Sequence, residues 1–397
     1  MVVKLTPGTN PCAKQLKDAV AQYLQWLRQN GYADATICDY ERLLKHFQNF
    51  INARNLPWQA VFDYQTLCDF QKSCRLHFAV IAPRGLGRYL VAHQKIAAAF
   101  VRPHPPLPDI YEDFFSFLDA SQSVSSAEIK FTRKLLCALN SYLTNHGIGL
   151  ERLSIQHIDA FIARYSTGYQ YSTRRHIRTY LRKFLKYLYY QAKITKRDLA
   201  PLVVGAVYFA RCQPPKFLKS QELSGLFDDL NSPRNKDLRT AAMVHLGYFL
   251  GLRPKEVALI RLDDIGFAKS QIRIAVRKGA NPVKLPLPED TIKAVAAYVI
   301  AGRPKSSRRE LFLSHQPPHL PVTAATASHD ITRILKKTNP AATAYWLRHT
   351  YAQHLLESGA SIFELKEMMG HDNIQSARRY LAIHLELMRK VLFDETL

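Results

Sequence analysis

Hydrophobic residues recur at the spacing of amphipathic helices in two similar stretches of the first half of the chain. In residues 21–57 the pattern predicts two helices on either side of Gly31, and residues 111–149 repeat this layout. A further short helix is predicted after each stretch, around residues 64–70 and 155–161. We interpret the stretches as two helical modules, with duplication and coincidental similarity both left open. The second helices of the two pairs carry the apolar stripes Leu43, Leu44, Phe47, Phe50 and Ile51, and Leu135, Leu136, Leu139, Tyr142 and Leu143.

A very basic helix is predicted to close the second module, over residues 172–190 with Ser172 as its N-cap. Its apolar stripe consists of Ile177, Leu181, Leu185 and Leu188. The other surface carries six cations and no acidic residue. A solvated charged face is the ordinary alternative, but this excess of one sign favours contact with phosphates. The candidate DNA-binding residues are Arg174, Arg175, Arg178, Arg182, Lys183 and Lys186.

The last part of the chain mixes helices with strands. Leu238, Ala242, Leu246 and Phe249 lie at helical spacing, with Gly251 as a natural end and Pro254 suited to the first turn of the next helix. Residues 272–276 and 283–287 alternate apolar and polar positions around turn residues, which predicts a β-hairpin. The fold class expected is mostly α, with helical N-terminal modules and a mixed α/β domain containing a small hairpin or sheet.

Two proline-rich stretches, residues 102–108 and 211–216, interrupt the helical patterns. A chain of 397 residues is also longer than one hydrophobic core usually supports. We therefore expect three domains, over residues 1–103, 108–205 and 213–397.

The charge of the chain predicts a polyanionic partner. Lys and Arg number 55 against 32 Asp and Glu, which gives a formal net charge of +23. The basic residues run from Lys4 to Lys390, so a basic tail does not account for the excess. Because each neutralised phosphate releases a counterion, such a surface suits a nucleic acid. Charge alone leaves RNA and anionic membranes open.

Cysteine usage and hydropathy predict a cytoplasmic protein. The six cysteines show neither CxxC pairs nor a framework spacing, which is typical of reduced thiols. The first residues lack the apolar core of a signal peptide, and no apolar run is long enough for a membrane span. No membrane association is expected.

Near the C-terminus, the sequence predicts consecutive helices whose junctions hold polar side chains. One helix ends at Gly359, and Ser361 with Glu364 forms an S-x-x-E capping box for the next. Gly370 ends that helix, so that His371 directly follows a helix end. Tyr380 lies within the helix after it.

Four motifs resemble those of the tyrosine recombinase, or phage integrase, family. In order they are LGLRPKEV, RKGANPVKLPL, YWLRHTYAQHLLESGA and MMGHDNIQSARRY, and they cover the third segment. The second segment resembles the helical core-binding domain of this family, and the first resembles it more weakly. The resemblance implies an enzyme that cuts and rejoins double-stranded DNA through a 3′-phosphotyrosine, without a metal, cofactor or small-molecule substrate. It also implies a homo-tetramer on two DNA sites.

The resemblance assigns a role to each matching residue. Tyr380 matches the nucleophile, and Arg253 and Arg348 match two arginines whose guanidinium groups stabilise the charged transition state. Lys278 matches the lysine that protonates the 5′-oxygen, with Lys284 as a nearby competitor. The remaining matches are His371, a hydrogen-bond donor to the phosphate; Glu256, which would orient the site; and His349, assigned a supporting role in the fold.

Tyr345 is the one departure from the family's pattern. The family usually has His-x-x-Arg where this chain has Tyr345 and Arg348. A tyrosine hydroxyl donates hydrogen bonds, but its pKa near ~10 makes it a poor base at neutral pH. Four interpretations of this departure stay open. His371 compensates for the missing imidazole, the reaction is slower, the protein is impaired, or Tyr345 is simply a packed aromatic.

Several other functions are alternatives to recombination. A recombinase-like DNA-binding protein without catalysis and a type IB topoisomerase-like enzyme are the two rivals. The histidines of HTYAQH lack the spacing of a zinc site, and no GxxxxGK[ST] phosphate-binding loop occurs. Integration, transposition and chromosome or plasmid resolution are not distinguished, although the extra N-terminal module hints at a mobile-element enzyme. A prokaryotic, nucleoid-associated location is expected.

Overall fold

The computed structural model describes residues 11–74, 78–102, 107–120, 124–205, 215–231, 237–275, 282–370 and 380. Packing divides the chain into two compact units. One contains Met1–Val61, Phe70–Ile96 and Arg211–Leu397, and the other contains Phe62–Asp69 and Ala97–Ala210. The predicted boundaries at 103, 108, 205 and 213 stay predictions, and residues 103–106 and 211–214 of the predicted linkers lie outside the described residues.

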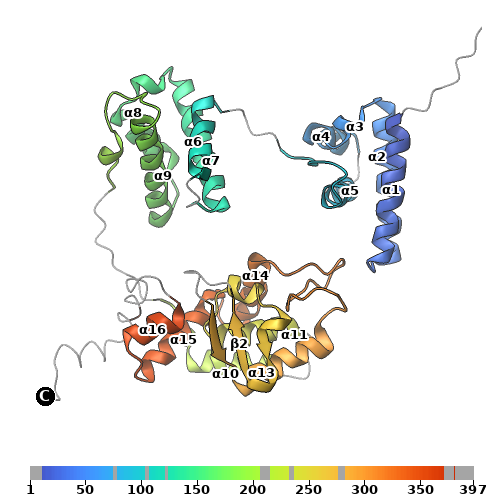
Figure 1. Cartoon of the computed structure of the whole chain (residues 1–397), viewed down its shortest axis with the longest axis vertical. Coiled ribbons are helices and arrows are strands. Elements are labelled where there is room, and N and C mark those ends of the chain that lie inside the picture. Colours follow the sequence, from blue (N-terminus) through green and yellow to red (C-terminus); the bar gives the residue numbers. More distant parts are fainter. Residues whose placement is uncertain are drawn as a thin grey trace, which may run out of the picture. The chain divides into compact units, whose positions relative to one another are not determined.

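The N-terminal part is helical (Figure 1). The predicted helix pair is confirmed, and Gly31 between the two helices has a φ of 76°. Of the predicted stripe, Phe50 is only partly buried and the other four residues are buried. The helices are α1 (Pro11–Gln29), α2 (Asp34–Ala53), α3 (Trp58–Val61), α4 (Tyr64–Ser73) and α5 (Ile81–Ala92).

Helix α5 was not predicted, because Pro83, Gly85 and Gly87 disfavour a helix by intrinsic propensity. Tertiary packing overrides that propensity. Leu86 and Leu90 are fully buried, and α5 packs against α1 and α2. A Cβ atom on Gly85 would collide with the side chain of Tyr23, so the absent side chain permits this close approach.

The second unit contains a four-helix arrangement with its own hydrophobic core. Leu135, Leu136, Leu139 and Leu143 are buried and Tyr142 partly buried, as the predicted stripe requires. The capping box Ser125–Glu128 begins the second helix, with the Ser125 N–H donating to Glu128 Oε2 over 2.9 Å. The helices are α6 (Asp109–Ala120), α7 (Ser126–Asn145), α8 (Ile155–Tyr165) and α9 (Tyr171–Tyr190), with 3₁₀ turns η1 (Leu150–Arg152) and η2 (Ala200–Leu202).

The basic helix is confirmed as α9, but its predicted N-cap is wrong. The N-cap is Gln170, in an extended conformation and without a side-chain cap hydrogen bond, so Ser172 lies inside the first turn. The Arg174 guanidinium donates to the Tyr169 carbonyl over 2.8 Å at this helix start. All four stripe residues, Ile177, Leu181, Leu185 and Leu188, are buried as predicted.

The C-terminal part combines helices with a small antiparallel sheet (Figure 1). Strands β2 (Gln271–Ile274) and β3 (Val283–Pro286) form the predicted hairpin, with Ile272 opposite Leu285. Strand β1 (Ile265–Gly266), which was not predicted, pairs with β2 and makes the sheet three-stranded. Residues 276–281, which connect β2 and β3 in the sequence, lie outside the described residues.

The helices of this part surround one large hydrophobic core that includes Leu246, Val257, Tyr298 and Leu347. Helix α11 packs against α13 and α15, and α12 packs against α14. The elements are α10 (Ser220–Asn231), α11 (Leu238–Phe249), α12 (Pro254–Ala258), η3 (Leu262–Asp264), η4 (Phe267–Lys269), α13 (Glu289–Ala297), the π-helix η5 (Tyr298–Gly302), α14 (Ala324–Thr338), α15 (Tyr345–Glu357) and α16 (Ile362–Met369).

None of the helices in the described parts of the chain has the length and apolar character that a bilayer span requires.

Candidate active site

The first site arginine lies at the start of helix α12. Arg253 is its N-cap residue and Pro254 occupies the first turn, as predicted. Glu256, which is buried, accepts from the Arg253 backbone N–H over 2.8 Å and from Arg253 Nη1 over 2.7 Å. Two hydrogen bonds donated to one carboxylate therefore hold both the backbone and the guanidinium of Arg253. This supports the orienting role proposed for Glu256.

Gly251 makes this turn possible. Its φ of 59° is in the left-handed region, and a Cβ atom there would lie 2.9 Å from Cε1 of the Tyr351 ring. The carbonyl of Gly251 accepts a hydrogen bond from Arg348 Nη1, which links the turn to helix α15. A residue with a side chain would thus disturb both the turn and its contact with Arg348.

Arg348, the second site arginine, is buried at 4% side-chain exposure in the first turns of α15. Its Nη1 and Nη2 donate to the backbone carbonyls of Gly251 and Met369, at the end of α16. Arg348 Nη1 also lies 3.8 Å from Glu256 Oε2. Glu256 therefore stands between the two predicted arginines, and these contacts bring three separate motifs into one cluster.

Helix α16 positions the next site residue. The predicted Ser361–Glu364 capping box begins it, and Gly370 ends it in the left-handed region with a φ of 56°. The Gly370 carbonyl accepts from Arg253 Nη2 over 3.4 Å. His371 follows directly but lies outside the described residues, so its predicted role stays a prediction.

Tyr380 is fully buried and its hydroxyl lies 2.8 Å from Nδ1 of His349. The ring packs in a small apolar cluster of its own, separate from the main core. The cluster also contains Ala352, Leu356, Leu365 and Met369. Two predicted site residues, Tyr380 and His349, are therefore in direct contact, which the sequence did not indicate.

Tyr345, the departure from the family pattern, begins helix α15 and is 48% exposed. The interpretation of Tyr345 as a packed aromatic is therefore wrong, because a core residue would be buried. Lys284 is exposed on β3 opposite Arg273, whereas Lys278 lies outside the described residues. The choice between the two lysines as proton donor stays open.

Nearby on α15, the ring nitrogen Nδ1 of His354 lies 3.4 Å from the Tyr248 hydroxyl of α11. Burial raises the pKa of Tyr248, which stays neutral in the working range. This pair joins α11 to α15 without touching Tyr380. His354 is thus a second imidazole on the same helix, with different surroundings from those of His349.

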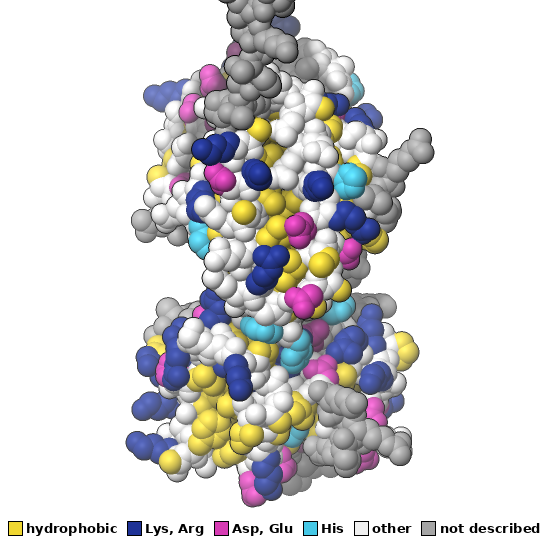
Figure 2. Space-filling view, turned by 90° about the vertical axis from the view of Figure 1, so that its right-hand side faces the viewer, with side chains coloured by type: hydrophobic (Ala, Val, Ile, Leu, Met, Phe, Trp, Pro, Cys, Tyr) yellow, Lys and Arg dark blue, Asp and Glu magenta, His cyan; other side chains and the backbone are white. Residues whose placement is uncertain are grey.

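The six cations of α9 do not share one environment. Arg182 donates through Nε and Nη2 to the Val203 carbonyl, over 2.9 and 2.5 Å, and so fixes the chain after the helix. Lys183 lies over the Tyr180 ring at 5.6 Å. Arg175, Lys183 and Lys186 are exposed, whereas Arg174, Arg178 and Arg182 are partly buried. On the face shown in Figure 2, Lys and Arg side chains are spread widely rather than gathered at one point.

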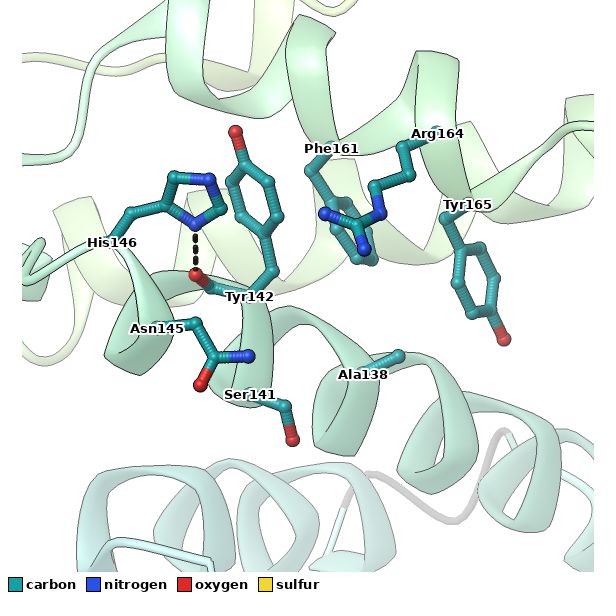
Figure 3. Close-up of a pocket in the computed structure, with 8 residues that line it drawn as sticks. All are labelled: Ala138, Ser141, Tyr142, Asn145, His146, Phe161, Arg164 and Tyr165. Atoms are coloured by element: carbon teal, nitrogen blue, oxygen red, sulfur yellow. Dashed lines mark hydrogen bonds between the residues drawn. The ribbon is translucent and has the colours of Figure 1, made fainter.

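A pocket in the second unit lies between α7 and α8 (Figure 3). The rings of Tyr142, Phe161 and Tyr165 line it, together with Arg164 and His146. At the end of α7, the His146 Nδ1–H donates a hydrogen bond to the Tyr142 carbonyl over 2.7 Å. The pocket thus presents aromatic surface rather than an acid–base pair. In the described ranges, no group of three or more His, Cys, Asp or Glu could hold a metal ion.

Comparison with known proteins agrees with this geometry. Residues 216–386 match the phage integrase family. Tyrosine recombinase XerD of Yersinia pestis is 26% identical over 290 residues, which cover 71% of this chain and 95% of that protein. An integrase/recombinase of Sinorhizobium fredii, y4rA, is 29% identical over 246 residues, 61% of this chain and 59% of the relative. For that relative, the match spans less than two thirds of its length.

Solved structures show the same fold. The recombinase XerH, bound to a palindromic difH substrate in a post-cleavage complex, superposes with a TM-score of 0.57 at 14% identity and covers 99% of both chains. Residues 82–397 of the Tn1549 transposon integrase, in complex with a circular intermediate DNA, give 0.54 at 16% identity over 68% of this chain and 94% of that one.

In sequence and in fold, the C-terminal part is similar to tyrosine recombinases, which are enzymes that cleave and rejoin DNA. The chain therefore contains a phage integrase domain over residues 216–386, and over 290 residues it is similar to a protein named tyrosine recombinase.

Proposed function

We propose that this recombinase acts at specific DNA sites and that Tyr380 attacks the scissile phosphodiester. The attack leaves a 3′-phosphotyrosine and a free 5′-hydroxyl, and the reverse attack by another 5′-hydroxyl rejoins the strand. Covalent catalysis of this kind retains the energy of the phosphodiester bond, so no cofactor is needed. The observation that carries the proposal is the cluster of Arg253, Glu256 and Arg348, drawn from two motifs and fixed to the end of α16.

The two guanidinium groups suit the charge that develops on a pentacoordinate phosphate. Each guanidinium has five fixed N–H donors and stays protonated at neutral pH. Their orientation is set before DNA binds, because Glu256 and three backbone carbonyls already hold them. In this proposal Lys278 protonates the 5′-oxygen and His371 donates to the phosphate, as the family resemblance implies.

The partner that we propose is double-stranded DNA, held by the C-terminal part and by the basic helix α9. The exposed Arg175, Lys183 and Lys186 would contact the phosphates of the DNA. XerH and the Tn1549 integrase were solved with DNA, which supports this choice. We further propose a tetramer on two DNA sites, and a location in the bacterial cytoplasm on the nucleoid.

The test is covalent trapping on nicked duplexes taken from sequences selected for binding to the full chain. We expect wild type to form a protein–DNA adduct that resists denaturant, and Tyr380→Phe to bind equally well without forming it. Peptide mapping should place the DNA on Tyr380. An adduct with Tyr380→Phe would refute the assignment of the nucleophile. Binding without any wild-type adduct would favour a recombinase-like DNA-binding protein.

Strand exchange separates recombination from relaxation of supercoils. Two labelled duplexes that each carry a site should yield recombinant products, with four protomers in the complex by light scattering. Relaxation of a supercoiled plasmid without exchange would favour the topoisomerase-like alternative.

A further inference from the structure

Residues 345 and 349, one helical turn apart on α15, point to a further catalytic residue. Residues 345 and 349 are four apart, so they lie on the same face of the helix. The resemblance gives an imidazole at position 345, but here Tyr345 is 48% exposed and has a phenol in its place. The imidazole on this face belongs instead to His349.

His349 touches the atom that reacts. Its Nδ1 lies 2.8 Å from the Tyr380 hydroxyl, within ordinary hydrogen-bond distance, and the ring centroids are 5.6 Å apart with the planes at 56°. The Tyr380 side chain is 0% exposed and packed against aliphatic side chains. Bulk water therefore does not reach the phenol in this arrangement, and its proton needs an acceptor from the protein.

Imidazole is the suitable acceptor by its chemistry. With an ordinary pKa of about 6.5, it is largely neutral at pH 7–8, and a base poised near the working pH is the most effective in proton transfer. A second phenol, with an ordinary pKa near ~10, would be a much poorer one. For Nδ1 to accept a hydrogen bond from the Tyr380 hydroxyl, the neutral imidazole must carry its proton on Nε2.

We propose that His349 is the general base for Tyr380, in place of the residue at position 345; this rests on the proposed function. In the cleavage step, the Oη–P bond forms while the P–O5′ bond breaks. The proton of the Tyr380 hydroxyl moves to His349 Nδ1, and the 5′-oxygen takes a proton from the general acid, assigned to Lys278. In the rejoining step, the P–O5′ bond forms while the Oη–P bond breaks. The attacking 5′-hydroxyl gives its proton to the now neutral Lys278, and His349 returns its proton to Tyr380 as the phenol leaves.

The decisive variant is His349→Asn. The asparagine Oδ1 is the same number of bonds from Cβ as the imidazole Nδ1, so it keeps the acceptor for the hydroxyl but takes no proton. We expect cleavage of a nicked duplex at pH 7.5 to fall by on the order of 10²–10³-fold, with unchanged DNA affinity. His354→Asn, the matched control on the same helix, removes an imidazole that contacts Tyr248 and should change the rate less than threefold.

The pH dependence of the cleavage rate separates catalysis from structure, because a purely structural role of His349 would leave the shape of the profile unchanged. Wild-type cleavage should decline on the acid side as an imidazole is protonated, near pH 6–7. His349→Asn should lose this acid limb. Arg253 and Arg348, the cations in the adjoining cluster, stay protonated across pH 5.5–9 and cannot produce it. Tyr345→Phe should cleave within about threefold of the wild-type rate and should keep the acid limb. Glu256, the carboxylate of the adjoining cluster, is present in all these variants, so it cannot account for a difference between their pH profiles.

Each outcome decides the proposal. A His349→Asn rate within about threefold of wild type, or an acid limb that persists in it, overturns the general base. A faster His349→Asn shows that the contact restrains the nucleophile, which also overturns it. If His349→Asn does not fold by circular dichroism, the wild-type profile and Tyr345→Phe decide: a wild type without an acid limb, or a loss of more than threefold in rate in Tyr345→Phe, overturns the proposal. Failure of wild type to form an adduct at Tyr380 refutes the proposed function instead.

Discussion

Replacement of Gly251 by alanine should destabilise the C-terminal part more than the same change at Gly359, the glycine that follows helix α15. A left-handed backbone costs a non-glycine residue about 1–2 kcal/mol. The new Cβ would also stand 2.9–3.0 Å from two atoms of the Tyr351 ring, closer than real Cβ contacts allow. Overpacking of a buried site adds about 1–3 kcal/mol. The expected loss in unfolding free energy is therefore about 2–5 kcal/mol.

The control for Gly251→Ala is Gly359→Ala. Gly359 follows α15 with a φ of 88°, yet a Cβ atom there would have no neighbour within 4 Å. It therefore carries the backbone cost of about 1–2 kcal/mol without the collision. Urea unfolding of both variants, followed by circular dichroism and Trp346 fluorescence in a chain whose other tryptophans are replaced, measures the difference. Equal losses in the two variants would refute the steric argument.

Gly251→Ala should also affect chemistry, because the Gly251 carbonyl holds Arg348. A misplacement of about 1 Å at a catalytic group can cost on the order of 10²-fold in rate. We expect the single-turnover cleavage rate of Gly251→Ala to fall by on the order of 10²-fold, measured without urea and at a temperature where the variant is folded. Gly359→Ala should cleave at the wild-type rate, and a parallel loss in both would point to general destabilisation.

Three further predictions follow from contacts in the described structure. Glu256→Gln should lower the cleavage rate by on the order of 10²-fold while DNA affinity in a filter assay stays the same, and unchanged cleavage would contradict its orienting role. Asp237→Asn should cost about 0.5–1 kcal/mol, mainly through the lost ion pair with Arg333, because asparagine caps a helix about as well as aspartate. Although burial raises the pKa of Asp237, hydrogen bonds and an ion pair outweigh this and lower it. A lowered folded-state pKa means that the carboxylate stabilises the fold above the ordinary pKa near 4, and that this stability is lost as the pH falls through the folded-state value. The difference in Tm between Asp237→Asn and wild type should therefore shrink between pH 7 and 3.5, and a constant difference would contradict the linkage. Arg182→Ala should lower the free energy of unfolding in urea by about 1–2 kcal/mol through the lost hydrogen bonds to the Val203 carbonyl. Arg175→Ala should leave stability unchanged and should reduce the salt dependence of DNA binding by about one ion. The reverse pattern would be inconsistent with the structure.

Local patterns were sufficient for much of the fold. The stripes of α2, α7 and α9, the Ser361–Glu364 box and the hairpin depend on residues close in sequence, and all are confirmed. Helix α5 and strand β1 were missed for the opposite reason. The first owes its stability to packing that accommodates glycines, and the second contains two residues, too few for a periodic signal.

The site was predictable as a set of residues and not as a set of contacts. The motif resemblance selected Arg253, Glu256 and Arg348, but no pattern indicates which carbonyls a buried guanidinium will meet. The contact between His349 and Tyr380 joins residues 31 apart and forms only when α15 and the Tyr380 segment pack. The single available signal was the imidazole one turn after the unexpected Tyr345, on the same helix face.

The small cluster around Tyr380 has a consequence for the timing of cleavage. Because this cluster is separate from the main core, the tyrosine can leave it without unfolding the rest of the C-terminal part. Burial of one aromatic side chain stabilises the docked position by about 2–3 kcal/mol, which corresponds to on the order of 1% undocked molecules. Met369 packs in the cluster through its side chain and accepts from Arg348 through its carbonyl. The nucleophile and the phosphate-binding guanidinium therefore share a support, so that docking of one orders the other.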